Sequence, residues 1–145
     1  MPRVRELDKD LLKEDRSSSP VRGNETILLV EDEPFVRSIA VDALRQQGYR
    51  VLEASNGKEA LKLAQSRGPE KIHLLVTDVI MPEMGGRDLV QQLSPLRADM
   101  KILYMSGYPD DAIGQHGVLD AKTDFLPKPF TPKVLQHKVR EVLDK

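Results

Sequence analysis

The chain contains no cysteine among its 145 residues, which excludes disulfide bonds and thiolate chemistry. A protein without disulfides fits a reducing compartment, so we expect it to act in the cytoplasm. No apolar run approaches the roughly 18 residues of a membrane span, and the first six residues, from Met1 to Glu6, form no apolar signal core. We therefore expect no membrane contact by this chain.

The chain also lacks an excess of charge of either sign. Lys and Arg number 22, Asp and Glu number 23, and the net charge is −1. This balance gives no electrostatic basis for bulk binding to nucleic acid, and we expect none. The three histidines, His73, His116 and His137, are scattered and form no spaced pair of metal ligands. What remains is an ordinary globular composition, with 39% apolar and 31% charged residues.

Two parts of the chain differ in composition. Residues 1–23 are rich in charge and then in Ser, which is typical of a flexible linker or N-terminal extension. Residues 24–145 alternate short β-rich runs with amphipathic helical patterns, which predicts one doubly wound α/β domain with a parallel sheet and helices on both faces. The strand candidates are residues 26–31, 50–53, 72–77, 101–105 and 123–126.

Capping residues predict where several helices begin and end. Pro34 suits the first turn of a helix that Gly48 ends. Asn56 and Glu59 match a capping box, and Thr131 suits the N-cap position of the last helix.

The weakest helical pattern lies between the fourth and fifth strand candidates. Pro109 opens it, and Gly114 and Gly117 interrupt it. Each glycine costs roughly 1 kcal/mol relative to alanine in a helix. We expect residues 107–121 to be the most mobile part of residues 25–145 in the free protein, and to become ordered on activation.

Chemically reactive side chains stand where the apolar runs end. Asp78 ends the third run, the pair Glu31 and Asp32 follows the first, and Ser106 and Lys128 follow the last two. The C-terminal ends of parallel strands converge on one crevice, so we expect these side chains to lie together. A carboxylate at the end of a buried strand is costly unless another group holds its charge.

These residue types suit phosphoryl transfer to an aspartate. Three clustered carboxylates tolerate one another when a hard cation neutralises them, and Mg²⁺ favours carboxylate oxygens and water. We therefore predict that Glu31, Asp32 and Asp78 hold one Mg²⁺, with the backbone carbonyl of Ile80 as a further ligand. An Asp carboxylate can attack phosphorus to form an aspartyl phosphate, while a lysine and a hydroxyl bind the remaining phosphoryl oxygens.

Four motifs, in this order along the chain, closely resemble those of the receiver domain of two-component response regulators. They are the first strand with its acidic pair at 27–33, the segment around the central aspartate at 75–86, the hydroxyl motif at 104–108 and the lysine motif at 125–130. The resemblance extends from about residue 25 to the end of the chain. It implies a flavodoxin-like sheet with strand order 2-1-3-4-5.

The resemblance also implies a role for each site residue. It makes Asp78 the phosphoacceptor, Asp32 a direct Mg²⁺ ligand, Glu31 a ligand through water, and Lys128 and Ser106 partners of the phosphoryl group. Ser106 is then the switch hydroxyl, and Phe125 matches the aromatic residue that rotates inward on activation. The phosphoryl group would come from a phosphohistidine on a histidine kinase or a histidine phosphotransfer protein. Such a domain catalyses its own phosphorylation and dephosphorylation and is not otherwise an enzyme.

The first 26 residues resemble the join between the catalytic domain of a hybrid histidine kinase and its C-terminal receiver. We therefore expect a receiver of a hybrid sensor kinase that works in a phosphorelay. A stand-alone single-domain regulator and a phosphorylation-independent scaffold are the alternatives, although a scaffold would normally lack part of the acid, hydroxyl and lysine set. Nothing in the sequence favours a particular oligomeric state.

Two enzyme classes fit the sequence less well. An aspartate-based phosphatase would want a second acid two residues after its nucleophile, where this chain has Ile80. A dinucleotide-binding domain would want a glycine-rich turn after the first strand, where residues 31–34 read Glu-Asp-Glu-Pro.

Overall fold

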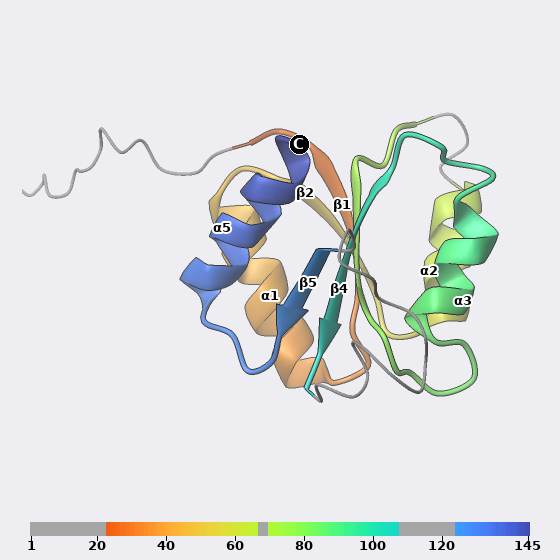
Figure 1. The fold of residues 1–145 in the computed structure, drawn as a ribbon, viewed down its shortest axis with the longest axis horizontal. Helices are drawn as coiled ribbons and strands as arrows, with labels where there is room; N and C mark the ends of the chain where they lie inside the picture. The colour runs from red at the N-terminus through yellow and green to blue at the C-terminus, as the bar shows by residue number, and fades with distance from the viewer. Residues whose placement is uncertain (1–22, 67–69, 108–123) are drawn as a thin grey trace, which may run out of the picture.

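The computed structural model describes residues 23–66, 70–107 and 124–145 (Figure 1). The strands and helices are β1 (Thr26–Val30), α1 (Pro34–Gln46), β2 (Arg50–Ala54), α2 (Gly57–Ser66), β3 (Leu74–Asp78), α3 (Gly86–Leu93), β4 (Lys101–Ser106), β5 (Asp124–Pro127) and α5 (Pro132–Leu143). They alternate from β1 to β4, and β5 and α5 follow after the residues that are not described.

The five strands form one parallel sheet in the order β2-β1-β3-β4-β5. This confirms both the predicted fold class and the predicted strand order. Helices α1 and α5 cover one face of the sheet, and α2 and α3 cover the other (Figure 1). Because β1 and β3 lie in the middle of the sheet and are covered on both faces, all their residues are buried, as their nearly continuous apolar sequences predict.

The apolar core is divided between the two faces of the sheet. Alternation along β1 sends Ile27 and Leu29 into the cluster beneath α1 and α5. Leu28 and Val30 join the cluster beneath α2 and α3. The two cores therefore hold β1 in register from opposite sides. This fixes the position of Glu31, the residue that follows β1 at the edge of the sheet.

Two predicted helix starts are confirmed. Pro34 occupies the first turn of α1. Thr131 is the N-cap of α5, and its side chain accepts a 3.1 Å hydrogen bond from the backbone N–H of Val134. The sequence did not indicate the cap of α1, which is Glu33, whose carboxylate accepts a 3.1 Å bond from the N–H of Phe35.

The predicted capping box of α2 forms in altered registry. The side chain of Asn56 accepts a 2.8 Å bond from the N–H of Glu59, as expected. The Glu59 carboxylate, however, accepts from the N–H of Ser55 at 2.6 Å and from its hydroxyl at 2.8 Å. Glu59 therefore reaches one residue further back than a standard box requires, because Ser55 offers it two donors at once.

The start of the described chain is fastened to helices on the same face of the sheet. The N–H of Gly23 donates to the carbonyl of Gln47, just after α1, at 2.9 Å. Arg140 of α5 lies 2.7 Å from Glu25 and has its guanidinium 5.9 Å from the ring centroid of Tyr49. The Arg140 guanidinium holds the pKa of Glu25 below its ordinary value.

The predicted linker at 1–23, apart from Gly23, and the weak helical pattern at 109–121 lie outside the described residues and remain predictions. Within the described ranges, no helix is both long and apolar enough to cross a membrane.

Candidate functional site

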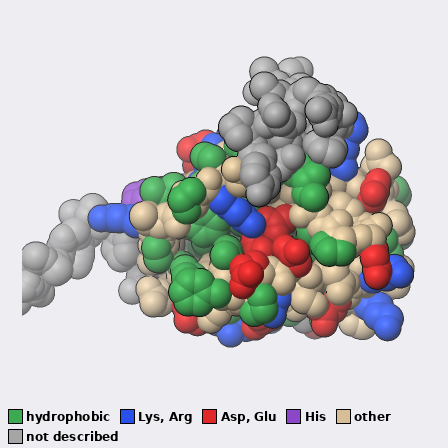
Figure 2. Space-filling view, turned by 90° about the horizontal axis from the view of Figure 1, so that it is seen from below, with side chains coloured by type: hydrophobic (Ala, Val, Ile, Leu, Met, Phe, Trp, Pro, Cys, Tyr) green, Lys and Arg blue, Asp and Glu red, His purple; other side chains and the backbone are tan. Residues whose placement is uncertain are grey.

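The C-terminal ends of the strands meet at one edge of the sheet, where acidic side chains gather at the centre of the exposed face (Figure 2). Asp78 is the last residue of β3, and Glu31 and Asp32 directly follow β1. These three acids each offer a carboxylate oxygen, and the three oxygens lie within 4.8 Å of one another. The predicted acidic cluster is therefore present.

Lys128 bridges two of these acids. Its Nζ lies 2.6 Å from Oδ1 of Asp78 and 2.6 Å from Oε1 of Glu31. Asp78 is only 4% exposed and Glu31 is fully buried. Among the residues that the structure describes, the second oxygen of Asp78, Oδ2, has no hydrogen-bond partner. The site thus pairs one ammonium group with two buried carboxylates, and Oδ2 of Asp78 remains available to accept a further interaction.

The two members of the acidic pair have different surroundings. Glu31 uses Oε1 toward Lys128, while its Oε2 accepts a 2.9 Å bond from the N–H of Glu33. Asp32 is exposed at the sheet edge. Because both oxygens of Glu31 are engaged, the arrangement favours Asp32 over Glu31 for direct contact with a cation.

The backbone ties Lys128 to the neighbouring strand. Its N–H donates a 2.8 Å bond to the carbonyl of Ser106, the last residue of β4. Ser106 is buried, and it lies next to the strand that carries Asp78 because β3 and β4 are paired.

Two further predicted residues lie near the site. Ile80 lies two residues past β3 with half its surface exposed, and Phe125 lies half-buried in β5. The ligand role of the Ile80 carbonyl and the switch role of Phe125 remain predictions.

Burial governs the protonation of this cluster. Desolvation raises the pKa of Asp78 to about 8, an effect that Glu31 strengthens and the Lys128 ammonium only partly opposes. Burial lowers the pKa of Lys128, but its contacts with Asp78 and Glu31 outweigh this and raise it overall. The single Lys128 ammonium therefore does not balance the negative charge of the clustered carboxylates. A further cation, or a proton on Asp78, would complete the balance.

The donor set fits magnesium. All the available side-chain ligands are carboxylate oxygens, which is the chemistry that Mg²⁺ favours. The unpartnered Oδ2 of Asp78 supplies an acceptor that is costly to bury alone. Among the described residues, no group of three or more His, Cys, Asp or Glu side chains other than this one could hold a metal ion.

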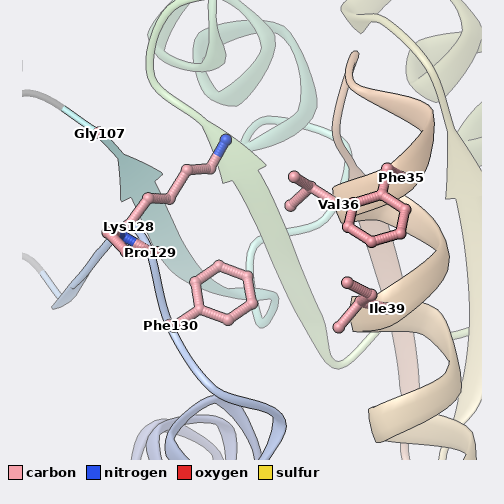
Figure 3. Close-up of a pocket in the computed structure, with 7 residues that line it drawn as sticks. All are labelled: Phe35, Val36, Ile39, Gly107, Lys128, Pro129 and Phe130. Carbon is pink, nitrogen blue, oxygen red and sulfur yellow. The ribbon is translucent and has the colours of Figure 1, made fainter.

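An apolar groove of about 600 Å³ opens beside the cluster (Figure 3). Phe35, Val36 and Ile39 of α1 form one side, and the segment from Lys128 to Phe130 forms the other. Phe35 is 72% exposed, and the Lys128 side chain extends from this segment toward the end of β3. The sequence did not predict this groove, and the one sign of it is a phenylalanine directly after Pro34, three residues past the acidic pair.

Comparisons with known proteins agree on one family. A family model described as the response regulator receiver domain matches residues 27–140. Sensor kinase CckA of Brucella abortus (strain 2308) is 43% identical over 133 residues, which make up 92% of this chain and 14% of that protein. The response regulator receiver protein CpdR of the same strain is 32% identical over 117 residues, covering 81% of this chain and 95% of CpdR.

A solved structure shows the same fold. The crystal structure of the receiver domain from the hybrid histidine kinase CckA is 39% identical to this chain and superposes with a TM-score of 0.68. The match covers 81% of this chain and 98% of that domain. The chain thus spans nearly all of an isolated receiver domain but only a small part of the sensor kinase.

Proposed function

Because this chain belongs to the response regulator receiver domain family, we propose that it accepts a phosphoryl group from a phosphohistidine onto Asp78 and changes conformation in response. The observation that carries this proposal is the position of Lys128, whose Nζ lies 2.6 Å from both Asp78 and Glu31 in an otherwise oxygen-lined site. The donor would be a histidine kinase or a histidine phosphotransfer protein, and the transfer would take place in the cytoplasm.

The transfer is a displacement at phosphorus. The Asp78 carboxylate forms the new O–P bond while the P–N bond of the phosphohistidine breaks, and the departing imidazole nitrogen keeps the electron pair and takes a proton from water. The Lys128 ammonium moves from carboxylate to phosphoryl oxygen, where it makes a charge-assisted hydrogen bond. The Ser106 hydroxyl, on the adjacent strand, binds a second phosphoryl oxygen.

Asp78, Asp32 and the Ile80 carbonyl would hold Mg²⁺ directly, and Glu31 would contact it through water. When bound, the ion supplies the positive charge that the three carboxylates and the phosphoryl oxygens require. Ser106 and Phe125 then form the switch: the hydroxyl is drawn toward the phosphoryl group and the ring fills the space that it leaves. The segment 107–121, with its weak helical pattern, is the element that these two residues would bias.

The apolar groove beside the cluster is the surface that the donor would use. A protein carrying a phosphohistidine must bring phosphorus to Asp78, so side chains that flank its histidine reach the rim of the site. Where the groove meets the site, that rim includes Phe35 on one side of the groove and Phe130 on the other, both apolar. The partner that fits is therefore a protein surface with apolar residues beside the phosphohistidine, whose anionic phosphoryl group meets Lys128.

We further propose that the domain belongs to a hybrid histidine kinase. The match to sensor kinase CckA and to the receiver domain of a hybrid kinase supports this context. The alternative, a stand-alone regulator, is supported by the match to CpdR along almost the whole of that protein. Reading the coding sequence upstream of Met1 decides between them, because a hybrid kinase requires an open frame that encodes a kinase domain.

Mass spectrometry tests the phosphoacceptor. With Mg²⁺ and acetyl phosphate, the intact mass should rise by one phosphoryl group, about 80 Da, and Asp78→Asn should abolish this gain because an amide is not a nucleophile. Asp88→Asn, which changes an exposed acid of α3, is the matched control and should be phosphorylated normally. An undiminished mass gain in Asp78→Asn would show that the acceptor is another residue.

A further inference from the structure

Arg37 turns back from α1 onto the loop that carries the acidic pair. Its Nη1 donates a 2.8 Å hydrogen bond to the backbone carbonyl of Glu31. Its Nε lies 3.6 Å from a carboxylate oxygen of Glu53 on β2, the strand next to β1. The guanidinium, whose side chain is only 20% exposed, thus joins the ends of two adjacent strands at the edge where Asp78 lies.

The place of Arg37 in its helix is electrostatically unfavourable. It lies in the first turn of α1, at the positive end of the helix dipole, where the only compensating acid of the helix start is the N-cap residue Glu33. Cations are favoured in the last turn, where α1 has Arg45. A cation at the opposite end is unfavourable, and the contacts of Arg37 with the Glu31 carbonyl and the Glu53 carboxylate offset this cost.

The Glu31 carbonyl belongs to the peptide group that links Glu31 to Asp32. Because a peptide group is planar, a hydrogen bond to this oxygen fixes the plane from which the Asp32 side chain departs. We propose that Arg37 is a positioning residue for the Mg²⁺ site: it orients the peptide group between Glu31 and Asp32 so that the Asp32 carboxylate faces that of Asp78. This inference rests on the proposed function, in which those two acids bind Mg²⁺ directly.

Arg45 provides a matched control on the same helix. Like Arg37, it approaches Glu53, at 3.8 Å, and donates to a backbone carbonyl, that of Val51, at 3.1 Å. Neither of these partners belongs to the acidic pair. A purely structural role of arginines on this face of α1 would therefore appear equally in both.

The sign of the effect separates positioning from simple charge. Arg37 is a positive charge close to a cation site, so if charge alone mattered, removing it would tighten Mg²⁺ binding. If Arg37 positions Asp32, removing it weakens Mg²⁺ binding instead. Loss of a residue that orients a metal ligand typically weakens metal affinity by about 10-fold or more.

The experiment measures the Mg²⁺ dissociation constant of the full chain by titration calorimetry, with amide chemical shifts as a second readout. Arg37→Met, which keeps the length but removes the donor, should raise Kd about 10-fold. Arg45→Met should leave Kd unchanged, and Arg37→Lys should give an intermediate loss because it keeps the charge but not the geometry. Thermal unfolding in EDTA reports separately on stability.

Unchanged or tighter Mg²⁺ binding in Arg37→Met would overturn the inference while leaving the proposed function intact. An equal loss in Arg45→Met would also overturn it, by showing that the effect is structural. If the unsubstituted chain bound no Mg²⁺, both this inference and the proposed metal site would fail. Should Arg37→Met not fold, Arg37→Lys decides: weaker binding supports the positioning role, and unchanged binding overturns it.

Discussion

At the scale of single residues, the protonation of Asp78 controls the site. Its carboxylate is 4% exposed and its pKa is raised to about 8, mainly by burial. In the unfolded chain, the same group would titrate near its ordinary value of 3.8. Folding therefore favours the protonated form when no cation is present. The stabilisation from this group is complete below pH 4 and is lost as the pH rises through about 8.

Replacing Asp78 should reveal this pH dependence. In EDTA, Asp78→Asn should be more stable than the unsubstituted protein, and the difference in the free energy of unfolding should grow by about 1–3 kcal/mol between pH 5 and pH 8. Urea unfolding followed by circular dichroism at several pH values measures it, with Asp88→Asn as the control. Parallel stability curves for the Asp78→Asn and unsubstituted proteins would contradict the raised pKa. Saturating Mg²⁺ should remove the difference, because the ion stabilises the charged carboxylate.

At the scale of single elements, one histidine joins three strands at the edge opposite the acids. The N–H of Thr26 donates to Nδ1 of His73 at 3.0 Å, and the N–H of His73 donates to the carbonyl of Thr26 at 2.9 Å. The carbonyl of His73 accepts from the N–H of Lys101 at 3.0 Å. His73 thus connects the beginnings of β1 and β4 although it lies just before β3.

Removing this side chain should destabilise the fold. His73→Ala leaves the buried N–H of Thr26 without its acceptor, which costs about 1–3 kcal/mol of unfolding free energy. His73→Asn supplies a side-chain carbonyl oxygen and should recover part of the loss. Chemical denaturation of the two variants measures the difference. Equal stability of His73→Ala and the unsubstituted protein would show that the Thr26 N–H is satisfied in another way.

Strands and helices were predictable from the sequence where a single pattern, such as a continuous apolar run, determines the structure. Runs such as 27–30 read as central strands because both faces of the sheet are covered there. The cap by Glu33 was not foreseen, since glutamate is not a favoured N-cap residue, and its carboxylate serves because the chain turns sharply before Pro34. Likewise, the reach of Glu59 to Ser55 depends on the path of the chain between β2 and α2, which residue preference does not encode.

At the scale of the whole molecule, the site combines residues that are far apart in sequence. The acids and Lys128 were predictable as neighbours because parallel strands end at one edge. The groove could not be predicted in this way. Its two sides are the first turns of α1 and the segment 128–130, and they come together only because α1 packs against α5. Sequence patterns show which residues are apolar, but only the assembled layers show which apolar residues remain exposed.

This groove gives a prediction that distinguishes docking from chemistry. Phe35→Ser should slow phosphoryl transfer from a phosphohistidine protein by about 10-fold, as expected for the loss of an aromatic anchor worth more than 1 kcal/mol. It should leave phosphorylation by acetyl phosphate unchanged, because a small donor needs no docking surface. Leu96→Ser is the control: Leu96 is also a well-exposed apolar residue, at 63%, but it lies after α3 and outside the groove. Equal slowing with both donors would place the defect in the site itself.

The fastening of Gly23 and Glu25 has a mechanical consequence. The chain enters β1 at the pole of the sheet opposite Asp78, and it is secured there to Gln47 beyond α1 and to Arg140 of α5 (Figure 1). A tether attached before Gly23 would pull on the two helices of one layer and would leave the acidic pole open to solution. If a larger body were attached before Gly23, the reactive end of the domain would therefore face away from the point of attachment, where a partner protein can reach it.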